Sequence, residues 1–156
     1  MKKEMVKKEG MEKEVVKKEF VDLGLSVKWA NMNEGAESSK ENGKYYACNE
    51  VSFDEGRLPS ESEILELIEK CKWEWVSKDG VVGYEITSRE EENKNQIFLP
   101  AAGLICGDRA YFVGKMGYYL SNTKKENMGV CELLMSPKYY GMYLAGSYKR
   151  SIRLVK

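Results

Sequence analysis

The stretch that decides the fold is residues 21–30, VDLGLSVKWA, which follows twenty residues made mostly of Lys and Glu. Its apolar residues share one parity: Leu23, Leu25, Val27 and Trp29. This alternation predicts a half-buried β-strand over residues 21–30. The chain closes on a similar short piece, SIRLVK, which predicts a last strand over residues 151–155. Strand signals therefore stand at both extremities, with most of the aromatic, glycine and polar residues between them.

The clearest helix signal covers residues 60–71. Ser60 is the expected N-cap, and Glu63 stands three residues further on, as a capping box requires. The expected buried face consists of Ile64, Leu65, Leu67, Ile68 and Cys71. A polar stretch at residues 35–43, GAESSKENG, has room for a second short helix.

Short strand signals fill the rest of the chain. Asp79-Gly80 is a strong hairpin turn signal, flanked by expected strands at 73–76 and 81–87. Residues 103–117 are rich in glycine and predict a long, shaped loop. Further strands are expected at 96–100, 130–135 and 139–144. One or two helices with many short antiparallel strands make this an α+β pattern.

Residues 1–19 form a charged N-terminal segment, set apart from a domain at residues 20–156. The heptapeptide at 3–9 recurs imperfectly at 13–19, and Glu and Lys alternate at a spacing of four. Such pairs stabilise a helix by about 0.2–0.5 kcal/mol each. Two alternatives stay open for this segment: a solvated tail, or a docking helix for a second copy or a virion partner.

The bulk composition excludes several classes of partner and chemistry. The chain has 156 residues, enough for one domain, and its 25 basic and 25 acidic residues cancel. We therefore expect no nucleic-acid partner, and no apolar run approaches the roughly 20 residues that span a bilayer. Histidine is absent, which excludes Ser-His-Asp, Cys-His and His-based metal chemistry. The N-terminus has no hydrophobic signal core, so we expect a virion-associated or cytoplasmic location unless a leader was removed.

The cysteines are spaced too widely for a CxxC metal or redox pair. They are Cys48, Cys71, Cys106 and Cys131. Buried reduced thiols are expected, with disulfides as the second interpretation. The three tryptophans are expected to fill the core with their N–H groups partnered: Trp29, Trp73 and Trp75. The acidic run at 90–92 is interpreted as a solvated loop.

Seven motifs in register resemble a known family. They are FVDLGLSVKWANMNEGA (20–36), GKYYACNE (43–50), RLPSESEILELIEKCKWEW (57–75), DGVVGYEIT (79–87), QIFLPAAG (96–103), GYYLSNT (117–123) and SIRLV (151–155). Together they are similar to the major paralogous domain of Bacteroidetes-type gut bacteria. The resemblance covers residues 20–156. Three motifs depart from the usual pattern: YYACNE replaces YYAWGE, GYYLSNT replaces GYYWSST, and KRSIRLV replaces GxSVRPV.

The resemblance implies a C-type-lectin-like fold, shared with formylglycine-generating enzymes and with the variable proteins of diversity-generating retroelements. In that fold the first and last strands pair, so residues 21–30 and 151–155 would be neighbours. The looped middle of the chain would face a ligand. The departures from the family pattern mean that no ligand specificity is carried over. The EPN, QPD and WND triplets of calcium-dependent lectins are absent, so we expect no metal and no cofactor.

A ligand-binding surface is expected in the region from Tyr118 to Tyr148. Tyrosines combined with Asn and Ser resemble the composition of antibody paratopes, and the retroelement-diversified members vary this part of the fold. The candidate residues are Tyr118, Tyr119, Asn122, Lys124, Tyr139, Tyr140, Tyr143, Ser147 and Tyr148. The alternative is that these tyrosines pack within the sheet.

Three functions are weighed. The first is a non-catalytic recognition module for a protein or glycan on a cell surface. The second is a structural or decoration component of a phage or other assembly, docked through residues 1–19. The third is an oxidase related to formylglycine-generating enzymes, which would need Cys106 and Cys131 to converge as low-pKa thiols.

Overall fold

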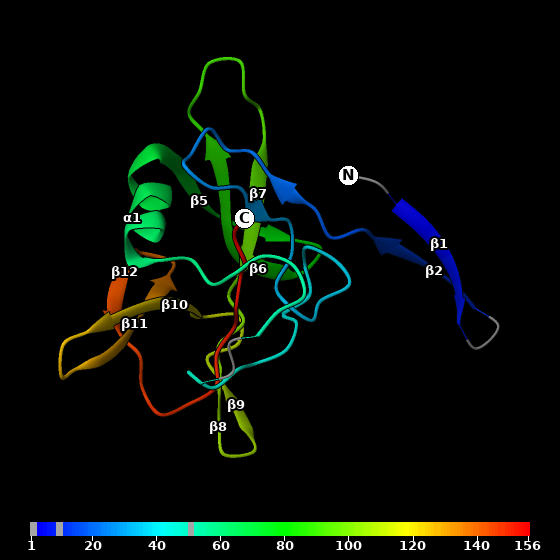
Figure 1. The fold of residues 1–156 in the computed structure, drawn as a ribbon. Coiled ribbons are helices and arrows are strands. Elements are labelled where there is room, and N and C mark those ends of the chain that lie inside the picture. Colours follow the sequence, from blue (N-terminus) through cyan, green and yellow to red (C-terminus); the bar gives the residue numbers. More distant parts are fainter. Residues whose placement is uncertain (1–2, 9–10, 50–51) are drawn as a thin grey trace.

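The computed structural model describes residues 3–8, 11–49 and 52–156, and it shows a mixed α+β fold (Figure 1). One ten-residue helix stands among small antiparallel sheets. The elements in chain order are β1 (Lys3–Lys8), β2 (Met11–Val16), β3 (Phe20–Val21), β4 (Trp29–Ala30), α1 (Glu61–Lys70), β5 (Cys71–Lys78), β6 (Val81–Ser88), β7 (Gln96–Pro100), β8 (Leu104–Cys106), β9 (Arg109–Tyr111), β10 (Gly117–Lys125), β11 (Gly129–Ser136) and β12 (Tyr139–Leu144). Two three-stranded sheets, β5-β6-β7 and β10-β11-β12, form the body of the domain.

Helix α1 begins where the sequence predicts. The Ser60 side chain accepts a hydrogen bond from the Glu63 backbone N–H, and the Glu63 carboxylate accepts one from the Ser60 N–H, so the capping box is confirmed. Ile64 and Leu67 are buried, as the periodicity predicts. Leu65, also expected on the buried face, is exposed, because the apolar stripe is narrower than the sequence suggests.

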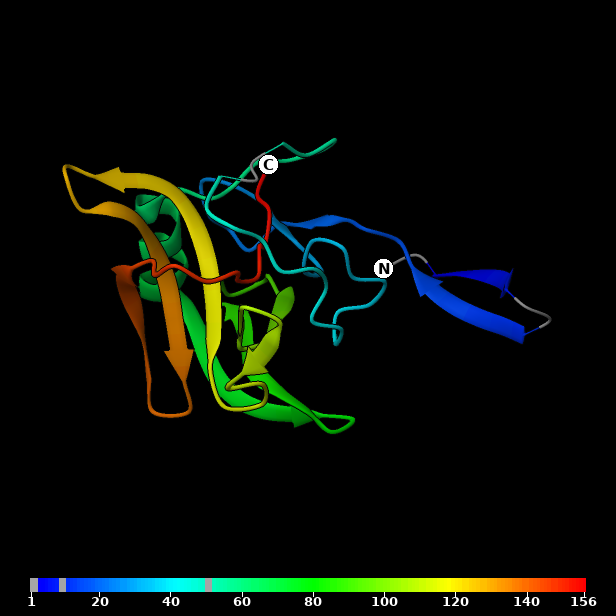
Figure 2. The same cartoon turned by 90° about the horizontal axis from the view of Figure 1, so that it is seen from below.

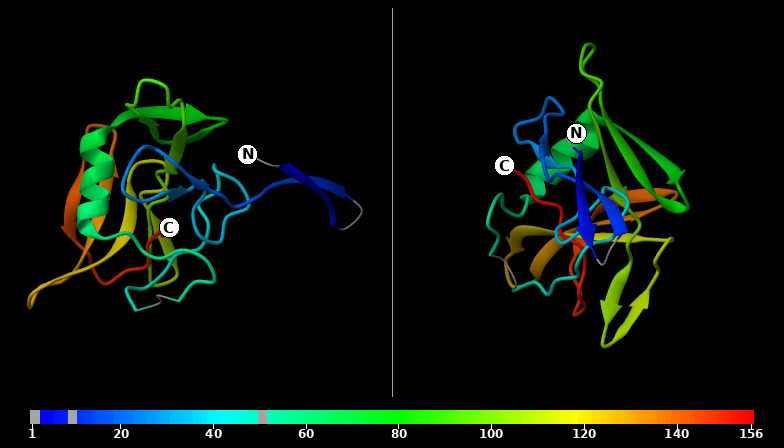
Figure 3. Two further views of the ribbon diagram at one scale, coloured as in Figure 1. Left: turned by 45° about the horizontal axis from the view of Figure 1, so that its top comes forward. Right: turned by 90° about the vertical axis from the view of Figure 1, so that its right-hand side faces the viewer.

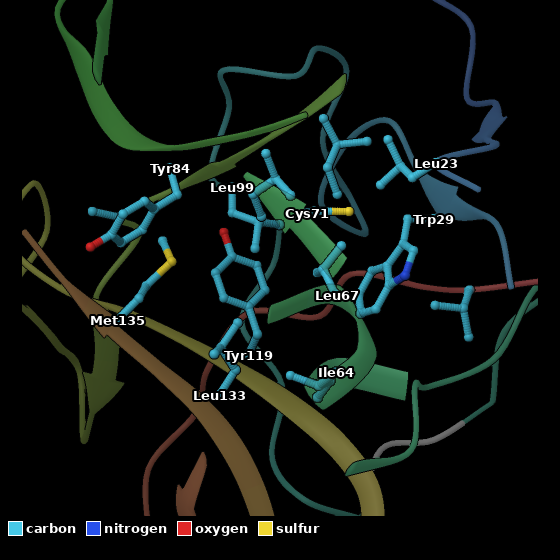
Figure 4. Packing of buried hydrophobic residues seen from close by; sticks show 14 residues of the cluster. Leu23, Trp29, Ile64, Leu67, Cys71, Tyr84, Leu99, Tyr119, Leu133 and Met135 are labelled. Carbon is cyan, nitrogen blue, oxygen red and sulfur yellow. The ribbon is translucent and has the colours of Figure 1, made fainter. Parts of the chain in front are cut away.

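The main core lies between α1 and the two three-stranded sheets (Figure 4). Ile64 and Leu67 reach it from the helix, Leu99 from β7, and Tyr119 and Leu133 from β10 and β11. A second cluster lies on the other side of β10 and contains Ala30, Leu58, Leu120, Ile152 and Leu154. Strand β10 is therefore covered on both faces, which is why its sequence lacks the alternation that identifies a half-buried strand.

The pairing of the two ends of the domain is confirmed. The backbone N–H of Lys28 donates to the Lys156 carbonyl at 2.9 Å, and the N–H of Lys156 donates to the Lys28 carbonyl at 3.0 Å. The Ala30 N–H donates to the Leu154 carbonyl at 2.9 Å. The C-terminal segment therefore runs through the middle of the domain beside β4 (Figure 1).

The two terminal strands are shorter than predicted. Residues 21–30 are not one strand but the short strands β3 and β4, separated by a bend in which Gly24 has φ +79°. The Asp22 carboxylate accepts the Gly24 N–H at 2.8 Å and fixes this bend. Residues 151–155 form isolated bridges with several partners rather than a continuous strand, because the segment crosses from one neighbour to another.

A buried arginine joins the C-terminal segment to three other parts of the chain. Arg153 is 1% exposed. Its Nε donates to Asn33 Oδ1 at 2.9 Å, Nη1 to the Ala30 carbonyl at 2.9 Å and Nη2 to the Phe98 carbonyl at 2.5 Å. Burial lowers its pKa to about 10. Within the described residues no carboxylate forms an ion pair with it, so neutral acceptors alone hold this cation.

The same network continues to β10. Asn33 Nδ2 donates to the Tyr119 hydroxyl at 3.1 Å, and that hydroxyl donates to the Pro100 carbonyl at 2.7 Å. Burial raises the pKa of Tyr119 above its usual range, so this group stays a neutral donor. The loop after β4, strand β7, strand β10 and the C-terminal segment are thus fixed by one hydrogen-bonded group.

Hairpin β5–β6 turns at Asp79-Gly80, as predicted, with φ +50° and +82°. Strands β7, β11 and β12 also lie where the sequence predicts them. Two other predictions are wrong. Residues 35–43 contain bends and turns but no helix, and residues 103–117 contain the hairpin β8–β9 as well as loop. Strand β10 was not predicted.

The N-terminal segment is neither a frayed tail nor a helix in its described part. Strands β1 and β2 pair antiparallel, with Lys3 opposite Val16 and Lys8 opposite Met11. The register pairs Lys7 with Glu12, whereas each of the other five pairs joins a charged residue to an apolar one. The hairpin projects away from the body of the domain in Figure 2 and in the left view of Figure 3. No helix in the described part of the chain is long and apolar enough to cross a bilayer.

Replacing Arg153 by Met should strongly destabilise the protein. The change leaves three buried acceptors without their donors, and each such loss costs about 1–3 kcal/mol. The expected total of about 3 kcal/mol or more corresponds to a fall in Tm of roughly 6–12 °C for a chain of this size. Thermal unfolding followed by circular dichroism measures it, with Arg109→Met at an exposed site of β9 as control. An unchanged Tm for Arg153→Met would show that the hydrogen bonds of Arg153 do not stabilise the fold.

Candidate functional site

The sheet β10-β11-β12 has two faces with different roles, because successive side chains of a strand alternate. Tyr119, Leu133 and Met135 face α1 and the main core. Tyr118 lies opposite Leu134, and Tyr143 opposite Glu132, on the other face. We call this second side the outer face. Seven of the nine predicted residues lie on β10 or β12, and the other two, Ser147 and Tyr148, follow β12.

Two of the predicted residues belong to the inner face and to the scaffold. Tyr119 is 3% exposed and part of the Arg153 network. Tyr140 stacks on Trp73, with ring centroids 4.3 Å apart and 7° between the planes, and meets Tyr84 edge-on at 5.1 Å. The prediction that Tyr119 and Tyr140 offer a surface is corrected accordingly: for these two, the alternative of packing within the sheet holds.

Two others form an exposed pair on the outer face. Tyr139 and Tyr143 are 44% and 48% exposed, and their ring centroids lie 5.6 Å apart. Gly141 lies between them on β12, and a Cβ there would come within 2.5 Å of the Tyr139 hydroxyl oxygen. The missing side chain thus lets the Tyr139 ring lean along the strand towards Tyr143. Hydrogen bonding to Tyr143 raises the pKa of Tyr139. We call this pair the tyrosine ledge.

A buried charged group lies beneath the outer face. Glu132 and Arg150 are both inaccessible to solvent, with Arg150 Nε donating to Glu132 Oε1 at 3.2 Å. The Tyr148 hydroxyl donates to the second oxygen of Glu132, and the Arg150 guanidinium lies 4.6 Å from the centre of the Tyr148 ring. Burial raises the pKa of Glu132, while Tyr148 and Arg150 oppose that shift.

Tyr148 is therefore a rigid, half-buried residue. Its ring meets Tyr118 edge-on at 5.5 Å, and Tyr118 itself is 6% exposed and supports Tyr148 rather than reaching the surface. Arg150 Nη2 donates to the Gly146 carbonyl at 2.5 Å and so fixes the loop that carries Ser147. Of these three predicted residues, Ser147 and Tyr148 are available to a ligand and Tyr118 is not.

Two adjoining pockets bring together four of the predicted residues. The first, which we call the Tyr148 pocket, has a volume of about 670 Å³ and includes Ser147 and Tyr148. The second, the Asn122 pocket, has a volume of about 440 Å³ and includes Asn122 and Lys124. Both are lined by Cys48 and Val130, so they adjoin at the end of the sheet, and we call the two pockets together the furrow. Volumes of this size are typical of small-ligand sites.

The far wall of the furrow was not predicted. It comes from residues 47–48 and 52–58, including Cys48, Phe53 and Arg57. This segment reaches the sheet because Tyr46 and Arg150 exchange backbone hydrogen bonds of 2.7 and 3.0 Å. Nothing in the local sequence indicates a bridge between residues more than a hundred positions apart.

Asn122 is held in place by the segment before α1. Its backbone N–H donates to the Pro59 carbonyl at 2.9 Å and its side-chain amide to the Leu58 carbonyl at 3.3 Å. Asn122 lies within the irregular stretch between Leu120 and Lys124, where the regular pairing of β10 with β11 is interrupted. Asn122 and Lys124 are exposed.

The thiols and tryptophans differ in part from expectation. All four cysteines are free, as expected, but only Cys71 and Cys131 are buried; Cys106 is exposed at the end of β8 and Cys48 is half-buried. Burial raises the pKa of Cys71 to about 11 and also raises the pKa of Cys131.

Trp73 Nε1 donates to the Leu67 carbonyl at 2.9 Å, as expected of a partnered indole. Trp29 Nε1 is buried without an acceptor among the described residues, contrary to expectation. The described residues also contain no cluster of three Asp, Glu, Cys or His able to hold a metal ion.

No family model, curated protein or solved structure matches the chain.

The order of thiol reactivity should follow this burial. At pH 8 iodoacetamide should alkylate Cys106 first, Cys48 more slowly, and Cys71 and Cys131 last, as read by mass spectrometry of peptides. Because only the thiolate reacts, raising the pH to 9 should not activate Cys71, whose pKa of about 11 lies well above it. Fast alkylation of Cys131 at neutral pH would contradict its burial and favour the oxidase hypothesis.

Proposed function

We propose that this chain is a non-catalytic recognition module, built on a C-type-lectin-like scaffold, that presents its outer face to a protein or glycan on a cell surface. The observation that carries the proposal is the tyrosine ledge. Tyr139 and Tyr143 stay exposed side by side on a sheet whose other face is packed core. Exposed aromatic pairs on rigid elements supply contact area at low entropic cost.

The furrow beside the ledge supports the same function. Tyr143 lies opposite Glu132 on β11, and Glu132 accepts a hydrogen bond from the Tyr148 hydroxyl. The tyrosine ledge and the furrow therefore adjoin across strand β11. Ser147, Tyr148, Asn122 and Lys124 line the furrow. The resemblance to the major paralogous domain and to retroelement variable proteins, noted above, agrees with a ligand-facing surface in this region.

The ledge is tested by separating binding from folding. Tyr139→Ala with Tyr143→Ala should reduce binding to cell surfaces or to an immobilised glycan panel by about tenfold or more, as for central aromatic contacts. The Tm should change little, because both rings are exposed. Tyr111→Ala is the matched control, since Tyr111 is 43% exposed on β9.

Tyr140→Ala should behave in the opposite way and lower the Tm, because Tyr140 stacks on Trp73 in the aromatic core. Equal loss of stability in the Tyr139/Tyr143 variant and in Tyr140→Ala would show that the ledge is part of the core and not a binding surface.

A second candidate function, a component of a phage or other assembly, is favoured by one observation. Strands β1 and β2 form a two-stranded sheet of their own that projects from the domain (Figure 2), with the Val16 N–H donating to the Glu37 carbonyl at 3.4 Å. An isolated two-stranded hairpin is marginally stable in water. A partner strand from a second copy or from a virion protein would stabilise it.

Deleting residues 1–16 should therefore lower the molecular mass in solution to that of a monomer while leaving the domain folded. Light scattering measures the mass and circular dichroism the fold. If the full-length chain is already monomeric in solution, self-association is removed as the role of the hairpin. Loss of incorporation into a virion would then be the remaining test of this candidate.

A further inference from the structure

The walls of the furrow carry one sign of charge. The charged residues that line the two pockets are Arg57, Lys124, Lys149 and Arg150. No carboxylate of the described residues lines either pocket. Two other hollows of the surface differ: the pocket at 90–95 combines three glutamates with Lys94, and the pocket beside Phe20 combines lysines with Glu19 and Glu55.

Two of these four cations are already neutralised. Arg57 makes a bidentate pair with Glu63, with N–O distances of 2.8 and 2.7 Å, and Arg150 pairs with the buried Glu132. Lys124 and Lys149 are exposed and form no ion pair within the described part of the chain. Lys149 lines the Tyr148 pocket and Lys124 the Asn122 pocket, so each half of the furrow has one uncompensated ammonium group.

This local charge stands out because the whole chain is neutral. Residues 117–150 contain five basic and two acidic residues, while the remainder contains twenty basic and twenty-three acidic residues. The segment that forms the outer face therefore carries three net positive charges in a protein that carries none. Hollows lined by one sign of charge concentrate ligands of the opposite sign.

We propose that the furrow binds an anionic oligosaccharide, with one carboxylate or sulfate group near Lys149 and another near Lys124. This inference rests on the recognition function proposed above and names its ligand. The floor of the furrow is suited to sugar rings. Val130 and Ala145 give it apolar surface and Tyr148 an aromatic edge, while Ser147 and Asn122 supply hydroxyl and amide groups.

Other anionic ligands fit the furrow less well. Acidic peptide motifs are usually recognised by clusters of arginines, whereas the two arginines that line the furrow, Arg57 and Arg150, are both paired with glutamates. Nucleic acids need a much higher density of cations, and nucleic-acid-binding domains are typically basic overall. Two free lysines on a chain with a pI near 6.4 do not meet that requirement.

The proposal is tested by calorimetric titration of the full chain with three hexasaccharides. A polygalacturonate hexamer and a heparin-derived hexamer are the anionic probes, and maltohexaose is the neutral one. The anionic probes should bind, maltohexaose should bind at least about tenfold more weakly, and raising NaCl from 50 to 300 mM should weaken the anionic complexes. Lys124→Glu with Lys149→Glu should lower affinity by about tenfold or more.

Lys94→Glu, in the loop between β6 and β7, makes the same charge change per site at an exposed position away from the furrow, and it should stay within about twofold of the parent. Equal effects of the furrow pair and of two remote changes, Lys94→Glu with Lys72→Glu, would overturn the assignment to the furrow. So would tighter binding of a poly-glutamate peptide or of a single-stranded oligonucleotide than of either anionic sugar.

The rate at which Cys48 is alkylated tests whether the sugar binds in the furrow, independently of charge. Its half-buried thiol lies where the two pockets meet. In a Cys106→Ser background a bound hexasaccharide should slow alkylation of Cys48 by about tenfold at saturation, since a ligand blocks its bound fraction. Binding without protection would place the sugar elsewhere. If the furrow variants bind normally and the Tyr139/Tyr143 variant does not, the recognition function stands and the furrow proposal fails.

Discussion

The structure depends on a buried cation, Arg153, that forms no ion pair with any residue the structure describes. Moving a guanidinium out of water is costly, and the cost is offset here by acceptors from three separate segments. Asn33, Ala30 and Phe98 must all be in place before Arg153 can be buried. This requirement favours one arrangement of the chain ends over others. It also explains how short strands such as β3 and β4, of two residues each, can hold the ends of the domain together.

The outer face can contact a ligand because the residues that fill the main core come from the inner face. Tyr119, Leu133 and Met135 fill the core side of the sheet, and Tyr140 closes it against Trp73. The opposite side of β10 is covered by Ile152, Leu154 and their neighbours, a cluster that contains no residue of β12. What remains uncovered is the edge strand β12 and the furrow at the sheet end. The pair Glu132–Arg150 fixes the floor of that furrow without adding net charge.

The elements that sequence predicts well are those specified by local chemistry. Ser60 and Glu63 define the start of α1, and Asp79-Gly80 defines a hairpin, whatever the rest of the chain does. Strand β10 could not be found in this way, since both of its faces are buried and its period is lost. The N-terminal charge spacing is misleading, because its i,i+4 Glu–Lys pairs predict a helix, yet the described residues form a hairpin in whose register only Lys7 and Glu12 are an opposite-charge pair.

The candidate site shows the same limit. Sequence composition located the tyrosine-rich region but could not separate Tyr139 and Tyr143 from Tyr119 and Tyr140, because that division requires the register of the sheet. The furrow was beyond reach, since half of its wall arrives through the contact between Tyr46 and Arg150.

The alternation along β12 has a consequence for diversification. Positions 139 and 143 point to solvent, while 140 and 142 pack on the core cluster. A gene that mutated only the first set would sample new specificities at little risk to the fold, and one that mutated both would lose most of its products to misfolding. Any natural or laboratory library on this scaffold should therefore vary positions 139 and 143 of β12 and keep the intervening core positions constant. Position 141 should keep its glycine codon.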